Sequence, residues 1–172
     1  MASTSIETAG SPTGSSPELL AHVQQVWDGI KPTSAIYNIL LSNIRFVSAT
    51  HGRIIAHLPL EPVHLNSKKI LHGAVSASIV YWAGGMAIAS TGLAKTGVSA
   101  DIHISYVSTA REGDTLEVEA WTSKVGKNMG FTMVEIRRLT AEGERKGVVA
   151  TGSHTKYLNF VQPADLPVAG AS

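Results

Sequence analysis

The pair His72–Gly73 stands where a polar loop meets a long apolar segment, and this junction could do chemistry. A helix that begins there has backbone N–H groups without acceptors and the positive end of its dipole, and both favour negative charge. Gly73 has no Cβ, so a bulky group could approach its N–H closely. On its own the pair is more typical of an ordinary loop-to-helix junction, and its surroundings decide between the two interpretations.

The composition excludes several other chemistries. The 172 residues include no cysteine, which rules out disulfides, thiolate zinc sites and cysteine nucleophiles. The seven histidines form no pair at i, i+4, and no glycine-rich phosphate loop or G-x-S-x-G motif occurs, so we expect no metal and no cofactor. Lys and Arg total 14 against 13 Asp and Glu, and this balance argues against a nucleic-acid partner that is held by a basic field.

The length suits one domain with a sizeable core. Residues 1–16 are rich in Ser, Thr, Gly and Pro and predict a disordered tail, residues 17–160 a single domain, and residues 161–172 a C-terminal tail. Neither end resembles a targeting signal. Together with the lack of cysteine, this favours a cytoplasmic protein.

Apolar periodicity predicts the first elements. Residues 17–30 have helical spacing, with Pro17 at the start and Lys31–Pro32 at the end. Two extended runs on either side of a turn at His51–Gly52 predict a hairpin. Residues 70–94 contain no Asp, Glu, Lys or Arg, which is long enough to suggest a membrane span. Several serines and glycines within that stretch favour a helix buried in protein instead, so we expect no membrane span.

The second half of the chain predicts strands. From Val98 to Tyr106, apolar residues alternate with Ser99, Asp101 and other polar residues, which is the period of a strand. Three further strands follow after short turns that contain glycine, and the four together predict an antiparallel meander. With the hairpin, we expect an α+β fold in which a six-stranded antiparallel sheet wraps around one long central helix.

The element order and the segment LNSKKILHGAVSASIVYWAGGMAIAS resemble the hotdog-fold acyl-CoA thioesterases of the phenylacetate-pathway type. The likeness runs from about Val47 to Leu158 and includes the stretches 97–99, 126–127 and 152–156. It implies a hotdog fold that hydrolyses a thioester of coenzyme A or of another carrier. It also implies a homodimer or a dimer of dimers.

The resemblance also assigns roles to residues. It implies that the Gly73 N–H stabilises the oxyanion and that Asn66 polarises the carbonyl or places the water. It also implies that Ser99 supports the attacking water and that His72 has a structural role. Ser99 could equally be an outward polar residue of an alternating strand. The implied coenzyme A contacts are Ser99, Asp101, Tyr106, Arg111, Lys124, Gly126, Lys127, Asn128 and Tyr157. Basic residues at turns are more often simply solvated, and only the resemblance raises this interpretation.

The chain departs from the family at one position. Active members carry an acid nine positions after the motif histidine, which acts as base or nucleophile across the dimer interface. Here that position is Tyr81, and no Asp or Glu occurs between Glu61 and Asp101. A tyrosine, with a reference pKa near 10, is a poor base at neutral pH, and Tyr81 could equally be an aromatic filler beside Trp82.

Two hypotheses follow. The first is an acyl-thioester hydrolase with altered or weakened chemistry. The second is a non-hydrolytic protein that binds acyl thioesters, either repurposed for a dehydratase-like or cyclase-like reaction or acting as a scaffold. Tyr81 favours the second hypothesis, whereas Asn66, His72, Gly73 and Ser99 favour the first, and we lean towards the enzyme.

Overall fold

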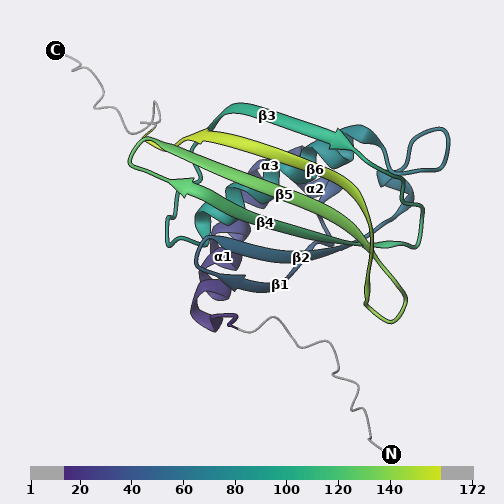
Figure 1. Ribbon diagram of the computed structural model, residues 1–172, viewed down its shortest axis with the longest axis horizontal. Coiled ribbons are helices and arrows are strands. Elements are labelled where there is room, and N and C mark those ends of the chain that lie inside the picture. Colours follow the sequence, from purple (N-terminus) through teal and green to yellow (C-terminus); the bar gives the residue numbers. More distant parts are fainter. Residues whose placement is uncertain (1–13, 160–172) are drawn as a thin grey trace, which may run out of the picture.

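The computed structural model describes residues 14–159, in which a curved sheet wraps around helix α3 (Figure 1). The helices are α1 (Pro17–Ile30), α2 (Ala35–Leu40) and α3 (Gly73–Ala89), with short 3-10 turns at Lys31–Thr33 and Pro62–His64. The strands are β1 (Arg45–Thr50), β2 (Arg53–Pro59), β3 (Val98–Tyr106), β4 (Thr115–Val125), β5 (Met129–Leu139) and β6 (Arg145–Tyr157). This architecture confirms the predicted six-stranded antiparallel sheet around a long central helix.

Helix α1 forms as its pattern predicts. The Ser16 hydroxyl caps it by accepting from the Leu19 N–H at 3.3 Å, and Trp27 is buried on its inner face. The Trp27 ring packs edge-on against Trp82 of α3, with centroids 5.5 Å apart. Helix α2 was not predicted, because its six residues are too few to show a helical period.

Helix α3 is buried over most of its surface, which confirms the prediction of a helix buried in protein, although Ala74 and Tyr81 lie on an exposed stripe. Twelve of its 17 residues are buried, Ile79, Val80 and Trp82 among them. Gly84 lets the helix approach the sheet, because an added Cβ would lie 2.6 Å from Thr132 Oγ1 and 2.8 Å from His154 Nδ1. Within residues 14–159, no helix is long and apolar enough to cross a membrane.

The predicted hairpin is confirmed, but the predicted four-strand meander is wrong for β3. The strand order is β1-β2-β4-β5-β6-β3, so β3 pairs with β6 and not with β4. Only β4, β5 and β6 form a meander. The segment after β3 returns to the other side of the sheet, where the Leu60 N–H donates to the Asp114 carbonyl at 2.8 Å. Strand β3 is therefore an edge strand, and its outer edge has no partner among the described residues.

A bulge interrupts the alternation expected along β3. Ser99 lies opposite Lys156 of β6, and Asp101 lies opposite the preceding residue, Thr155, which leaves Ala100 as an extra residue. Ser99 therefore shares the inner face of the sheet with Ile102, and Asp101 lies on the outer face. The expectation that Ser99 and Asp101 share a face is wrong, because one inserted residue reverses the side on which every earlier residue lies.

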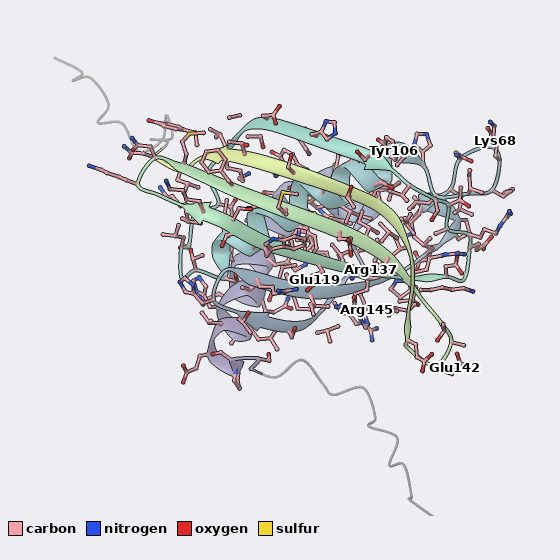
Figure 2. All side chains as sticks on the ribbon, viewed as in Figure 1. Lys68, Tyr106, Glu119, Arg137, Glu142 and Arg145 are labelled. Atoms are coloured by element: carbon pink, nitrogen blue, oxygen red, sulfur yellow. The ribbon has the colours of Figure 1, made fainter. Side chains whose placement is uncertain are left out.

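Charged side chains cover part of the outer face of the sheet. The carboxylate of Glu119 is 5% exposed and lies 3.2 Å from an Arg145 guanidinium nitrogen and 3.7 Å from one of Arg137. A third arginine, Arg53, donates to the same carboxylate from β2. Figure 2 shows Glu119, Arg137 and Arg145 close together on this side. The network satisfies a buried carboxylate on the face turned away from α3.

The predicted tails fall mostly outside the described part of the chain, namely at residues 1–13 and 160–172. Ser15 and Ser16, which the prediction places in the N-terminal tail, are hydrogen bonded to the backbone of Ala49.

Candidate active site

The start of α3 leaves one backbone donor without an acceptor. His72 is the N-cap residue, and its Nδ1 accepts from the Ala74 N–H at 3.0 Å. The His72 carbonyl accepts from the N–H groups of Val75 and Ser76. The Gly73 N–H has no acceptor among the described residues. His72 therefore caps the helix, and Gly73 offers a donor at the positive end of the helix dipole.

Asn66 lies in the tight loop before this helix start. Its Oδ1 accepts from the Lys68 N–H at 2.9 Å and from the Ile70 N–H at 3.4 Å, and a bridge between Leu65 and Leu71 closes the loop. These bonds occupy the side-chain oxygen. The NH₂ group of Asn66 is therefore the part of the side chain that can donate to a carbonyl oxygen.

Tyr106, at the end of β3, lies against the start of α3. Its hydroxyl donates to the Gly73 carbonyl at 3.2 Å, and a Cβ added at Gly73 would lie 3.4 Å from its ring. A cavity of about 230 Å³ opens beside Gly73 and Tyr106. We call Asn66, His72, Gly73 and Tyr106 the oxyanion corner.

A second group of side chains gathers on the inner face of the sheet, where it meets the middle of α3. Ser99 Oγ lies 2.8 Å from His154 Nε2. The Tyr81 ring lies 5.2 Å from the His154 ring, between centroids, and the Lys156 Nζ lies 5.2 Å from the Tyr81 ring centroid. We call Tyr81, Ser99, His154 and Lys156 the Tyr81 cluster.

Burial changes the proton affinities in the Tyr81 cluster. It lowers the pKa of His154 to about 4, with the nearby Lys156 as the next cause and Asp101 acting weakly in the opposite direction. Burial also lowers the pKa of Lys156 to about 8. The His154 imidazole is therefore neutral at pH 7, and Lys156 gives up its proton more readily than an ordinary lysine.

The Tyr81 cluster adjoins a cavity of about 750 Å³ between α2, α3 and the start of β3. Most of its wall is apolar, with Ile36, Trp82, Met86 and Val98 among the lining residues. Tyr81 and Lys156 also line it. The cavity can take an apolar group whose polar end lies beside Tyr81.

One copy of the chain keeps the oxyanion corner and the Tyr81 cluster apart. Gly73 and Tyr81 are eight residues apart on α3, which is about 12 Å along the helix axis. A single carbonyl group cannot touch the Gly73 N–H and the Tyr81 cluster of the same chain.

The predicted coenzyme A contacts are also divided between the two ends of the sheet. Lys124 lies near the end of β4, and Gly126, Lys127 and Asn128 form the β4–β5 turn. The Leu158 N–H, next to Tyr157, donates to the Asn128 carbonyl of this turn at 2.7 Å. Arg111 precedes β4, whose 11 residues span about 35 Å. Figure 2 shows Tyr106 at the far end from that turn, on the side of Lys68. Asp101 lies on the outer face.

Known proteins identify the family of this chain. The model of the thioesterase superfamily matches residues 68–143. Human acyl-coenzyme A thioesterase 13 is 36% identical over 119 residues, which is 69% of this chain and 82% of the relative. The chain belongs to the thioesterase superfamily.

Solved structures agree with this assignment. The crystal structure of zebrafish thioesterase superfamily member 2 has a TM-score of 0.71 and 29% identity, and it covers 81% of this chain and 98% of that one. The Escherichia coli protein from the phenylacetic acid degradation operon has a TM-score of 0.66 over 81% of this chain and 95% of that one. At 23% identity, the second likeness supports the fold alone.

Two residues of this thioesterase superfamily member were missed as site residues. His154 and Lys156 fall within a stretch that matches the family, yet the sequence analysis gave them no chemical role. Their spacing was the available signal, because two polar residues at i, i+2 share one face of a strand, here the buried one. Among residues 14–159, no three His, Asp or Glu side chains are grouped to hold a metal.

Proposed function

We propose that this thioesterase superfamily member hydrolyses acyl-CoA or a related acyl thioester. The observation that carries the proposal is the unpaired Gly73 N–H at a capped helix start, because an oxyanion that forms on a thioester carbonyl needs such a donor. The named activity of the human relative, 36% identical, supports the substrate class.

We propose that the active unit is a homodimer, or a dimer of dimers, built on the unpaired edge of β3. Val98, Ile102 and Tyr106 are between 36% and 61% exposed along that edge. Antiparallel pairing with the β3 of a second copy sets the Tyr106 end of one strand beside the Ser99 end of the other. The oxyanion corner of one copy then lies beside the Tyr81 cluster of the other, which one chain alone cannot achieve.

Each group has a role in this arrangement. The Gly73 N–H and the Asn66 NH₂ donate to the carbonyl oxygen of the thioester, and the acyl chain enters the cavity of about 750 Å³. Ser99, held by the neutral His154, positions a water beside the carbonyl carbon. Attack of this water breaks the C–S bond and releases the acid and the thiol.

The same pairing brings Arg111 of one copy towards the β4–β5 turn of the other. We propose that Arg111, Lys124 and Lys127 bind the phosphates of coenzyme A. Lys127→Glu is expected to weaken coenzyme A binding by about 1–2 kcal/mol. This loss of binding free energy should be much smaller at high salt, because salt screens the charge of the phosphates. Calorimetry tests this against Lys146→Glu, a matched change at an exposed residue of β6. Equal affinities in the two variants would remove Lys127 from the site.

The central experiment measures thiol release by the full chain from acyl-CoA substrates of increasing chain length. Asn66→Ala and Ser99→Ala are each expected to be impaired, because each damages a different half of the shared site. A refolded equal mixture of the two should recover about one quarter of wild-type activity, since half of the dimers are mixed and each has one intact site. A mixture no better than the separate variants would contradict the shared site.

Tyr81 favours a second candidate function, that of a non-hydrolytic protein which binds acyl thioesters, as a scaffold or with a dehydratase-like or cyclase-like reaction. Such a protein would bind acyl-CoA in calorimetry yet release no thiol from any acyl chain. The predicted cytoplasmic location is a further proposal, which microscopy of the tagged full chain tests.

A further inference from the structure

Lys156 is a buried cation without a counter-charge. The residue is 3% exposed, and its side-chain Nζ makes no hydrogen bond or ion pair with another described residue. Buried ammonium groups are normally paired with a carboxylate, because an isolated charge is costly to remove from water. The Lys156 Nζ lies over the face of the Tyr81 ring but meets no carboxylate, and a lysine in this state is a candidate for a functional role.

The titratable and polar groups around Lys156 come from three elements, because β5 places only Gly130 opposite it. Helix α3 presents Tyr81, β6 presents His154, and β3 presents Ser99, which lies opposite Lys156 in the register. The cavity wall adds Tyr37 and Lys95, and it contains no Asp or Glu among the residues described. Asp101 lies on the outer face of the sheet. Within residues 14–159, the inner face therefore has no carboxylate to hold the Lys156 proton.

We propose that Lys156 is the general base of the hydrolysis, in place of the carboxylate that position 81 does not provide. The proposal rests on the proposed thioester hydrolysis and identifies which group activates the water. The Nζ lies 5.2 Å from the centroid of the Tyr81 ring, lines the same cavity, and is on the face that carries Ser99 and His154.

Other nearby groups are worse suited to this task. The His154 Nε2 is already bonded to Ser99, and its pKa near 4 makes it a weak base. Lys156, with a pKa near 8, is a stronger base and is partly neutral at pH 7. The efficiency of a general base is greatest when its pKa lies close to the working pH.

The proton balance closes without another reactant. The neutral Lys156 amine takes a proton from water as the water oxygen bonds to the thioester carbonyl carbon. The tetrahedral intermediate collapses, the C–S bond breaks, and the Lys156 ammonium returns the proton to the departing thiolate. The products are the acid and the free thiol, and the amine is regenerated.

The test uses Lys156→Met, Lys156→Arg and the double variant Lys156→Met/Tyr81→Asp, with Lys146→Met on the same strand as the matched control. Both single changes at Lys156 should lower kcat at least 100-fold, because neither methionine nor a charged arginine can accept a proton. Affinity for coenzyme A should stay within about threefold. The kcat of the double variant should be at least tenfold higher than that of Lys156→Met, because a carboxylate then lies beside the water.

The dependence of activity on pH distinguishes a general base from a residue that has only a structural role. Wild-type kcat/KM should rise about tenfold per pH unit up to pH 8 and then level, because the base must be deprotonated. In the double variant this rise should vanish between pH 6 and 8. Wild-type turnover and an unchanged profile in Lys156→Met would overturn the proposal.

Intact-mass measurement during turnover separates a base from a nucleophile. An acyl amide that accumulates on Lys156 would overturn the proposal, because the amine would then have attacked the carbonyl itself. Failure of the proposed function looks different. In that case the wild-type chain releases no thiol from any acyl-CoA, so the Lys156 variants have no activity to reduce.

Discussion

Ser99 Oγ and His154 Nε2 lie 2.8 Å apart, although 55 positions separate the two residues in the sequence. The bulge at Ala100 makes this bond possible, because it turns Ser99 to the inner face of the edge strand. Ser99→Ala should therefore lower kcat about 10–100-fold, and it should lower the free energy of unfolding by about 1–2 kcal/mol, since the buried imidazole loses its partner.

Steady-state kinetics and urea unfolding check this prediction. Ser105→Ala is the matched control, because Ser105 lies on the exposed outer face of the same strand. An equal effect of both changes would show that the bond to His154 has no special importance.

The buried His154 should make stability depend on pH. Its pKa is about 4 in the folded protein against 6.5 as the ordinary value, so the unfolded chain binds a proton first as the pH falls. The stabilisation is complete above pH 6.5 and is lost progressively as the pH falls to 4, by about 2–3 kcal/mol in total. Urea unfolding across this range checks the slope. In His154→Asn, which cannot titrate, the slope should be shallower, and an identical slope would contradict this assignment.

Lys156 should cost stability at neutral pH. Its pKa is about 8 in the folded protein against 10.5 ordinarily, so the cost of burying the charged lysine is complete below pH 8 and is lost as the pH rises to 10.5. Lys156→Met is expected to raise the free energy of unfolding at pH 7 by about 1–3 kcal/mol, and most of this gain should be gone at pH 10. Denaturant titration at both pH values measures the difference. A destabilised variant at pH 7 would mean that the lysine has a stabilising partner.

Tyr81→Asp should increase hydrolysis at pH 6, where Lys156 is mostly protonated. A carboxylate at this position stays ionised at that pH, so it can activate water when the lysine cannot. We expect turnover of a medium or long acyl-CoA to rise at least tenfold, with little change in KM. Tyr81→Asn, which adds a polar group but no base, is the control. A rise of the same size in the asparagine variant would point to access to the cavity instead of base catalysis.

Two glycines of α3 should respond differently to alanine. At Gly73 an added Cβ would lie 3.4 Å from the Tyr106 ring, an ordinary contact, so the fold should tolerate it. The methyl group would stand beside the N–H that receives the carbonyl oxygen, and kcat/KM should fall about 10–100-fold.

At Gly84 the added Cβ would lie 2.6 Å from Thr132 Oγ1, and unfolding should become easier by about 2 kcal/mol or more. Thermal unfolding and kinetics of both variants separate the two effects. A Gly73→Ala variant with normal kinetics would remove that N–H from the site.

The sequence by itself determined the elements whose signals are local. The apolar period of residues 17–30, the turn at His51–Gly52 and the uncharged stretch that became α3 each predicted the correct structure. The capped start at His72–Gly73 was also readable, because a helix N-terminus is defined by a few adjacent residues. These features depend on periodicity and turn chemistry within a single segment.

Only the tertiary structure decided how the elements combine. Turn residues fix where a strand ends but not which strand it joins, so β3 was expected beside β4 and lies beside β6 instead. One extra residue, Ala100, decided that Ser99 meets His154, and no local pattern marks such a bulge. The isolation of Lys156 also depends on three separate elements, because burial in a folded protein is set by long-range packing and not by neighbours in the sequence.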